Sequence, residues 1–262
     1  MNCKFSTNDF SINYVENTVG HSILWETHCH SKYEILAIME GELNVTIEGQ
    51  SFVLNDNDVI IIPPLLFHTT SVTKTGNYKR AVISFNQSKI PEELKPYFEA
   101  NCLSASSFYS NQPIELQKIC LSNRHEFYRA LTDSIIIKMM YEYIDSESEK
   151  NADHSESDVI IQKILSFIDD HLHEKTELDD IAAYVSHSKY YICHLFQERM
   201  KISIKQYILQ KKFALAEQII NDGISPTTVA LELGYNNYSN FYRLYVKYRN
   251  KAPSKNASKK KI

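Results

Sequence analysis

Short apolar runs separated by turn residues characterise the first third of the chain. The runs at residues 33–39, 43–47 and 59–62 are rich in β-branched residues, and glycine, asparagine or aspartate falls between them. Short runs of this kind, bounded by turn residues, are typical of strands joined by tight turns. We therefore expect an all-β unit over residues 23–85.

A helical pattern replaces these short runs between residues 113 and 144. Apolar residues recur there every three to four positions, as expected for one face of an α-helix. Such helices either cover the β unit or form a dimer face. The recurring residues are Ile114, Ile119, Phe127, Leu131, Ile135, Met139 and Tyr143.

A polar segment separates the two halves of the chain. Residues 145–158 read DSESEKNADHSESD, which is rich in serine and acidic residues and offers almost nothing to bury. A segment of this composition cannot offset the entropy lost on ordering. We therefore predict a flexible linker, with bounds at residues 146–157.

Every segment after the linker has helical periodicity, and the pattern occurs twice. Ile181-Ala182 in the first copy matches Val229-Ala230, which lies 48 residues later. Past a short turn, the three residues from His194 match the three from Arg243 at an offset of 49. The sequence therefore predicts a helix, a short turn and a second helix, twice over.

Capping residues support these helix boundaries. Thr176 and Asp179 have the spacing of a capping box, and Ser225-Pro226 places an N-cap residue before a proline at the first helical position. Gly234 lies where a helix has to end in a left-handed conformation. Either Asn236 or Asn237 is expected to cap the helix that follows.

The second helix of the second copy has an apolar face and a polar, cationic face. Four residues at helical spacing are expected to face the core, namely Phe241, Leu244, Tyr245 and Tyr248. The residues left outside suit a DNA major groove, because arginine can grip guanine and asparagine can grip adenine through two hydrogen bonds each. These outer residues are Ser239, Asn240, Arg243 and Lys247.

The corresponding helix of the first copy has a less cationic outer face. Its inward positions are Ile192, Leu195 and Phe196. Any helical hairpin shows a polar face opposite an apolar one, so this pattern alone does not identify a DNA-binding unit. The residues left outside are Lys189, Tyr190, Cys193, His194 and Gln197.

Charge is distributed unevenly along the chain. Residues 1–157 carry 12 basic and 21 acidic side chains, whereas residues 158–262 carry 16 basic and 11 acidic ones. A basic part joined to an acidic part is the pattern expected when only one domain meets phosphate. A solvated lysine face with a basic tail is the structural alternative.

Length and composition indicate two globular domains in the cytoplasm. The chain has 262 residues, enough for two domains of roughly 100–150 residues. Its longest apolar run, residues 59–67, is far shorter than the ~18 residues that a membrane span needs. The five cysteines are scattered and form no CxxC pair, so we expect reduced thiols, no membrane association and a cytoplasmic protein.

The C-terminal repeat resembles the AraC/XylS family of transcription regulators. The stretch ELDDIAAYVSHSKYYICHLFQERMKIS is similar to the family's first helix-turn-helix signature, and VALELGYNNYSNFYRLYVKYRNKAP is similar to its second. The resemblance implies a linking helix over residues 204–220, with Ala216 as its closely packed small residue. It also implies base contacts from Tyr190, Cys193 and His194 in one helix and from Ser239, Asn240 and Arg243 in the other.

Two positions depart from the family pattern. The family usually has glycine where this chain has Lys201 and Asn250. Asparagine accepts a left-handed backbone more readily than lysine does. The departure at Lys201 therefore leaves the turn after the first recognition helix open.

The β half contains two motifs that resemble those of cupins, which are small β-barrels. The first is HCHSKYE, with His28, His30 and Glu34, and the second ends at His68. In metal-binding cupins these four positions coordinate one ion. Here the glycines of the motifs are replaced by Ser22, Asn57 and Leu65, and Val72 stands where the pattern has asparagine.

Three roles remain open for these four residues. They bind an effector without metal, or they hold a transition metal, or they are structural. Sensor domains of AraC-type regulators often keep such histidines without a metal. We therefore expect effector-binding at His28, His30, Glu34 and His68, with no metal and no cofactor.

Together these features predict an α+β multidomain protein. The expected parts are a cupin-like effector-binding domain at residues 1–90, a helical dimerisation region at 91–145, the linker, and a paired helix-turn-helix domain at 158–255. The expected function is that of a sequence-specific, non-enzymatic transcription regulator, an activator by resemblance. The expected partners are double-stranded DNA with two elements about one turn apart, a small-molecule effector such as a sugar, RNA polymerase and a second copy of the chain.

Two other classes of protein remain as alternatives. One is a cupin metalloenzyme whose helical domain is an accessory, and the other is a DNA-compacting protein without an effector. Stoichiometric metal and turnover would identify the first. Absence of sequence preference would identify the second.

Overall fold

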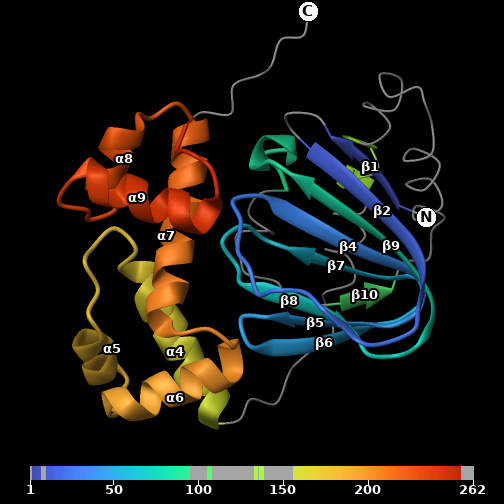
Figure 1. The fold of residues 1–262 in the computed structure, drawn as a ribbon, viewed down its shortest axis with the longest axis horizontal. Helices are drawn as coiled ribbons and strands as arrows, with labels where there is room; N and C mark the ends of the chain where they lie inside the picture. Colours follow the sequence, from blue (N-terminus) through green and yellow to red (C-terminus); the bar gives the residue numbers. More distant parts are fainter. Residues whose placement is uncertain are drawn as a thin grey trace, which may run out of the picture. The chain divides into compact units, whose positions relative to one another are not determined.

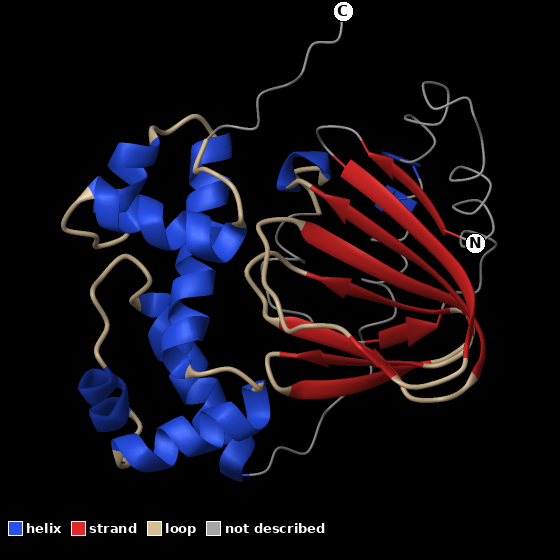
Figure 2. Cartoon of the chain, in the orientation of Figure 1, coloured by secondary structure: helices blue, strands red, loops and turns tan. Residues whose placement is uncertain are grey.

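The computed structural model describes residues 2–6, 10–94, 105–107, 133–134, 136–138 and 156–254. Two compact units can be separated, the first made of Met1–Glu26 and Lys32–Asn151 and the second of Thr27–Ser31 and Ala152–Ile262. Strands form the first unit and helices the second (Figure 2), so the expected α+β fold class is confirmed. Most of the expected dimerisation region and of the expected linker lies outside the described residues.

Two antiparallel sheets make up the strand unit. Their strand orders are β1-β2-β9-β4-β7-β10 and β3-β8-β5-β6 (Figure 1). The strands expected near residues 33–39, 43–47 and 59–62 are confirmed as β4, β5 and β7. The strand bounds are β1 (Asn2–Ser6), β2 (Phe10–Val19), β3 (Ile23–Leu24), β4 (Tyr33–Glu40), β5 (Leu43–Ile47), β6 (Gln50–Leu54), β7 (Asp58–Ile62), β8 (His68–Val72), β9 (Gly76–Phe85) and β10 (Ala105–Ser107).

The larger sheet is buried on both faces, and β4 shows this most clearly. Ile35 and Ala37 belong to one apolar cluster and Leu36 and Ile38 to another, because successive side chains point to opposite faces of a sheet. Each of these isoleucine and leucine side chains contributes roughly 1.5–3 kcal/mol on burial. A strand buried on both faces reads as a continuous apolar run, which is why the sequence identified β4 readily.

Strand β2 was not predicted from the sequence, although it pairs with β9 over its full length. The paired register runs from Phe10 opposite Phe85 to Val19 opposite Gly76. The signal was present, since Phe10, Ile12 and Tyr14 alternate with polar residues and all three are fully buried. The all-β unit therefore begins before residue 23.

Six described helices form the second unit, and helix, turn, helix occurs twice in it as expected. The two pairs are α5 with α6 and α8 with α9, and α7 joins them (Figure 1). No helix of the described segments is long and apolar enough to cross a membrane. The helix bounds are α4 (Glu156–Asp170), α5 (Leu178–Tyr184), α6 (Lys189–Met200), α7 (Ile204–Asn221), α8 (Pro226–Glu232) and α9 (Tyr238–Arg249).

The core of the second helix pair is aromatic. Phe213 of α7 lies at its centre, with its ring centroid 6.0 Å from that of Phe241 and 5.5 Å from that of Tyr245. Ala216 of α7 is completely buried in the same cluster, as the resemblance implied for the linking helix. This core holds α9 against α7 by the apolar face that its spacing predicted.

Candidate nucleic-acid interface

The N-terminus of α5 is capped one residue later than the sequence suggested. Glu177 is the N-cap and forms a capping box with Asp180, so the expected pairing of Thr176 with Asp179 is wrong. Thr176 is instead occupied by a hydrogen bond from its hydroxyl to the carbonyl of His171, at 3.3 Å. A threonine hydroxyl that bonds to the preceding turn is no longer available as a cap.

Helix α6 presents a partly aromatic outer face. Ile192, Leu195 and Phe196 are buried as expected. Tyr190 is 82% exposed, and its ring stacks on that of His194 with 6.4 Å between centroids. The expected outer residues Lys189, Tyr190, His194 and Gln197 are all exposed, whereas Cys193 is half-buried.

Contacts with carboxylates occupy cationic side chains and a histidine on this face. The Nζ atom of Lys189 lies 2.9 Å from Oδ1 of Asp179, and this hydrogen bond raises the pKa of Lys189. Nδ1 of His194 lies 3.9 Å from a carboxylate oxygen of Glu198 one turn later. Both pairs lie at the surface, where their contribution to stability is small. The weaker cationic character expected for this face agrees with these contacts.

Helix α9 presents the polar, cationic face that its sequence predicted. Asn237 is the N-cap and accepts a hydrogen bond from the amide of Asn240 at 2.8 Å, which confirms one of the two expected caps. Phe241 and Tyr245 are buried, with Leu244 and Tyr248 packed against them. The four outer residues Ser239, Asn240, Arg243 and Lys247 are all exposed.

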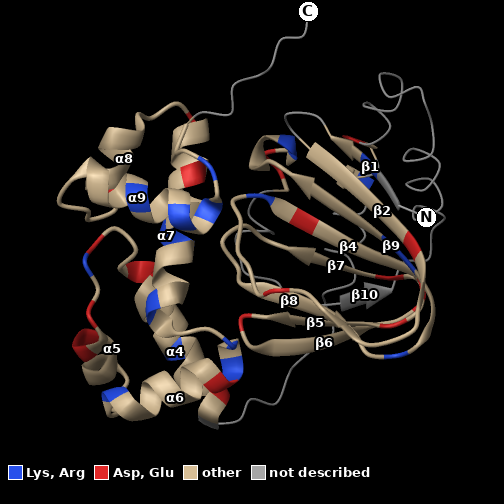
Figure 3. Ribbon diagram, viewed as in Figure 1, with Lys and Arg blue, Asp and Glu red and all other residues tan. Residues whose placement is uncertain are grey.

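Positive charge is concentrated on α9. The helix contains Arg243, Lys247 and Arg249 and no acidic residue (Figure 3). Arg249 has a structural role, because its Nη2 donates a hydrogen bond to the carbonyl of Gln210 in α7 at 3.3 Å. Arg243 and Lys247 therefore carry the cationic character of the exposed face.

Caps and left-handed turns mark several helix ends in the two pairs. Ser225 caps α8 with Pro226 in its first turn, and Gly234 has a φ of +79° directly after α8. Lys201 and Asn250 adopt the left-handed conformation at the ends of α6 and α9, with φ of 59° and 52°. Both turns are thus made here without glycine.

Sequence reasoning missed two exposed tyrosines on the recognition helices. Tyr191 of α6 is 40% exposed and Tyr242 of α9 is 42% exposed. Tyr242 follows Ser239 by three positions, so helical periodicity alone was enough to place it beside the outer residues. Aromatic rings at such positions can make apolar contact with a thymine methyl group.

The four expected sensor residues come together. One ligand atom from each of His28, His30, Glu34 and His68 lies within 4.8 Å of the others. Glu34 belongs to β4 of one sheet and His68 to β8 of the other, and Nε2 of His68 lies 3.8 Å from Oε1 of Glu34. Nδ1 of His68 lies 3.0 Å from the carbonyl of Leu66, which fixes the ring and leaves Nε2 directed at Glu34.

This donor set has the chemistry of a transition-metal site. Three imidazoles and a carboxylate suit zinc, iron, manganese or nickel, and a hydrogen bond from the second ring nitrogen to a carbonyl is usual for a metal-binding histidine. Two ligands of one ion, each about 2.1 Å from it, lie at most about 4.2 Å apart. The widest spacing within the group, 4.8 Å, therefore has to shorten before all four residues bind one ion.

Two of the positions where cupins have glycine are left-handed in this chain. Asn57 has a φ of 69° and Leu65 a φ of 66°. The backbone course of the motifs is therefore kept although the side chains are larger. Leu65 is only partly buried, three residues before His68.

Comparison with known proteins gives two family models that together cover most of the chain. The model of the AraC-like ligand binding domain matches residues 16–138. The model described as a helix-turn-helix domain matches residues 181–258. The first spans most of the strand unit, and the second begins within α5 and spans the rest of both helix pairs.

Curated relatives are regulators. An uncharacterized HTH-type transcriptional regulator of Escherichia coli, YdiP, is 24% identical over 88% of this chain and 80% of its own length. The Msm operon regulatory protein of Streptococcus mutans is 20% identical over 95% of each chain. A crystal structure of ToxT from Vibrio cholerae matches 94% of this chain and 96% of its own, with 12% identity and a TM-score of 0.44.

A strand unit that matches the AraC-like ligand binding domain precedes two helix pairs that match the helix-turn-helix domain. The relatives described above are regulators, and the similarity extends over most of their length. The chain therefore belongs to the AraC family of DNA-binding transcription regulators.

Proposed function

We propose that this regulator reads an operator with two short elements about one helical turn apart, placing α6 in one major groove and α9 in the next. The observation that carries the proposal is the pair of exposed polar helix faces joined by the single helix α7. This helix has 18 residues and is therefore about 27 Å long. That length is comparable with the ~34 Å between successive major grooves on one side of a duplex.

The residues of these faces take different roles in the proposal. Arg243 and Asn240 read bases in the element under α9, because both can make two hydrogen bonds to one base. Ser239 and Lys247 reach base edges or phosphate. Tyr190, Cys193 and His194 read the element under α6 with looser sequence demands, since none of them forms such a paired contact.

A two-element duplex tests this proposal. We expect the full-length protein, titrated in gel shifts against duplexes selected from a random pool, to bind two elements far more tightly than either element alone. Two linked contacts raise affinity well above that of one contact when both can form together. Equal affinity for single and paired elements would contradict the proposal, and absence of any sequence preference would favour a DNA-compacting protein.

We also propose that the protein senses a small polar effector, such as a sugar, through His28, His30, Glu34 and His68. Imidazole and carboxylate groups can exchange hydrogen bonds with hydroxyl groups, and Glu34 and His68 are buried where water competes little. The effector would favour one arrangement of two protomers and so change their fit to the operator. In this scheme the regulator works in the cytoplasm as a homodimer through residues 91–145 and activates RNA polymerase, without enzymatic activity.

A metal ion is the second candidate occupant of this site, favoured by the four donor atoms within 4.8 Å. With a metal bound, the unit would have the ligand set of a cupin metalloenzyme. Metal content and turnover distinguish the two proposals.

A further inference from the structure

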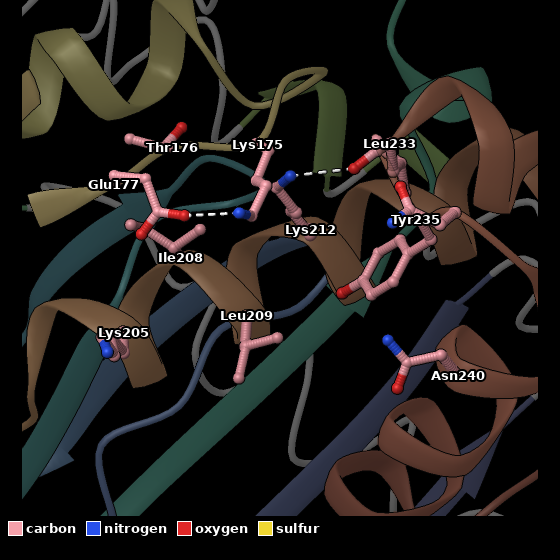
Figure 4. Close-up of a pocket in the computed structure, with 12 residues that line it drawn as sticks. Lys175, Thr176, Glu177, Lys205, Ile208, Leu209, Lys212, Leu233, Tyr235 and Asn240 are labelled. Carbon is pink, nitrogen blue, oxygen red and sulfur yellow. Dashed lines mark hydrogen bonds and ion pairs between the residues drawn. The ribbon is translucent and has the colours of Figure 1, made fainter.

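Lys212 of α7 connects the two helix-turn-helix pairs. Its side chain is only 6% exposed, and its Nζ donates to the carbonyl of Glu174 at 2.6 Å and to that of Leu233 at 2.8 Å. Glu174 lies in the segment that leads to α5, and Leu233 ends α8. Figure 4 shows Lys212 reaching Leu233 from the side of α7. One ammonium group therefore holds the segment before the first pair to the end of α8 in the second pair.

Because Lys212 is buried, these two hydrogen bonds have to replace the hydration of its ammonium group. An ammonium group removed from water is costly unless hydrogen bonds replace its hydration. Burial lowers the pKa of Lys212, which is the direction expected for a desolvated cation. Because the Nζ atom is already committed to two carbonyls inside the protein, Lys212 is not a phosphate-binding residue in spite of its charge.

Gly234 brings the same two segments into direct contact. A Cβ atom at Gly234 would lie 3.2 Å from the carbonyl carbon of Glu174 and 3.3 Å from the backbone of its neighbours. The turn of the second pair thus rests against the segment before the first pair with no side chain between them. A residue larger than glycine has to push these segments apart.

A cavity lies beside this contact. The cavity has a volume of about 330 Å³ and lies between the segment at Lys175 and Glu177, helix α7, and the start of α9 at Asn240 (Figure 4). No packed side chains fill this space between the two pairs. The contact at Lys212 and Gly234 therefore restrains the two segments beside this cavity.

Lys211, the neighbour of Lys212, provides a matched contrast. It is also buried, at 2% exposure, but its Nζ pairs with Asp169 of α4 at 2.5 Å and with the hydroxyl of Tyr207 at 3.0 Å. These partners belong to α4 and α7 and not to the second helix pair. Loss of Lys211 should therefore loosen α4 without freeing one pair from the other.

We propose that Lys212 is a positioning residue that sets the spacing between the two DNA elements. By tying Glu174 to Leu233 it fixes the distance and rotation between α6 and α9. One base pair added between the elements rotates the second by about 35° and moves it by about 3.4 Å. A rigid protein should reject such a change, and a protein without this link should tolerate it. This inference rests on the proposed function, because it requires both helices to read DNA.

The test measures binding against spacing. The probe is a duplex that wild-type protein selects from a random pool, remade with one or two base pairs added or removed between its elements. Full-length wild-type protein should lose at least about tenfold in affinity for a change of two base pairs, since both contacts no longer form together. The Lys212→Met variant should lose less than about threefold, whereas Lys212→Arg, which keeps a donor to both carbonyls, should restore the wild-type profile.

Lys211→Met is the control for simple destabilisation. It removes an equally buried lysine from the same helix and should leave the spacing profile unchanged. Gly234→Ala is an independent variant that should broaden the dependence of affinity on spacing, as Lys212→Met does. It replaces Lys212→Met in the test if that variant does not fold. A spacing profile unaltered in both folded variants would overturn the role of Lys212 while leaving the proposed function intact. Wild-type protein that binds one element as well as two would overturn the proposed function itself.

Discussion

Arg243 donates a hydrogen bond from Nη2 to Oδ1 of Asn240, 3.2 Å away and one turn earlier on α9. Both residues lie on the exposed face of the helix, and the bond holds the guanidinium group over the N-terminal turn. The N-terminal part of a recognition helix is the part that reaches base edges in most helix-turn-helix complexes. The two residues best suited to paired base contacts are therefore held next to each other before DNA binds.

The first prediction concerns Arg243. Arg243→Ala should cost about 1–3 kcal/mol on the selected duplex and relax specificity at one base pair, because a paired contact to guanine is lost. Gel-shift titrations on the selected duplex and on its single-base variants measure both effects.

The control for Arg243 is a charge in the C-terminal tail. Lys260 lies outside the described residues, and its contribution is expected to be electrostatic only. Lys260→Ala should lower affinity slightly and equally on every sequence. If Arg243→Ala also weakened selected and random DNA to the same extent, Arg243 would have no base-reading role.

The second prediction concerns the segment expected to link the two halves, residues 146–157. Helix α4 begins at Glu156, so the last two positions of that segment belong to a helix. Ordering the remaining polar residues would cost about 1–2 kcal/mol each with little apolar burial in return. Limited proteolysis should therefore cut first before Glu156 and release two folded pieces, as judged by mass spectrometry. A first cut within β4 or α7, with the linker resistant, would place the boundary elsewhere.

Signals that act within a few residues made much of the fold predictable. Ser225, Asn237 and Gly234 were identified because a cap or a left-handed turn depends on its immediate neighbours. The outer faces of α6 and α9 followed from helical periodicity in the same way. The first capping box was misplaced by one residue because the hydroxyl of Thr176 bonds to His171, a choice that the pattern does not encode.

Contacts between distant residues were beyond the sequence pattern. The partners of Lys212 lie 38 and 21 residues away, and in the sequence Lys212 is one more basic residue in a DNA-binding domain. The four sensor residues were identified by resemblance, but their separation depends on two sheets meeting face to face. The sequence therefore predicted which four residues form this cluster, but it did not predict the distances between them.

The third prediction concerns the end of α6. Lys201 has a φ of 59° and an exposed side chain, and its amide donates to the carbonyl of Gln197. Glycine keeps that hydrogen bond and removes the steric cost of the left-handed backbone, which is about 1–2 kcal/mol, although its unfolded state is more flexible. Lys201→Gly should therefore raise the free energy of unfolding by about 0.5–1 kcal/mol in denaturant titrations.

Asn250 at the end of α9 is the matched control. It has the same left-handed geometry, with a φ of 52°. Asparagine visits this region more readily than lysine does, so Asn250→Gly should give a smaller gain. A larger gain at Asn250 than at Lys201 would argue that backbone strain is not the cause.

The fourth prediction concerns stability at alkaline pH. Burial raises the pKa of Tyr245 to about 12, above the value of about 10 in an unfolded chain. Between these values the unfolded state loses the phenolic proton while the folded state keeps it. The stabilisation is thus complete below pH ~10 and is lost as pH rises toward 12, by up to about 1.4 kcal/mol per pH unit.

Replacement of the phenol should show this linkage. Tyr245→Phe should make the fall in unfolding free energy between pH 10 and 12 less steep, as followed by circular dichroism of the full-length chain. Tyr242→Phe, at an exposed position on the same helix, is the control for loss of a tyrosine hydroxyl. An equal slope for wild type and Tyr245→Phe would mean that this tyrosine ionises alike in both states.

The last prediction concerns the four sensor residues. Protein purified without affinity-tag metals should carry much less than one equivalent of transition metal, because a tight site needs its ligands within about 0.2 Å of ideal distances. The present spacing of up to 4.8 Å does not meet that requirement, and Leu65 replaces a small residue nearby. Elemental analysis measures this. About one equivalent of iron, manganese, nickel or zinc, lost on His30→Ala, would establish a metal site and return a cupin enzyme to contention.

If the same residues bind a polar effector instead, His30→Ala should abolish ligand-dependent stabilisation in thermal melts. A ligand that binds only the folded state raises stability in proportion to the logarithm of its concentration, so a lost site removes the whole shift. Basal DNA affinity should stay nearly unchanged, because His30 is not among the outer residues of α6 and α9. Gln197→Ala, on the exposed face of α6, is the reciprocal control, which should leave the thermal shift intact. A full shift in His30→Ala would contradict the sensor role, since a site that keeps its ligand without His30 does not depend on this cluster.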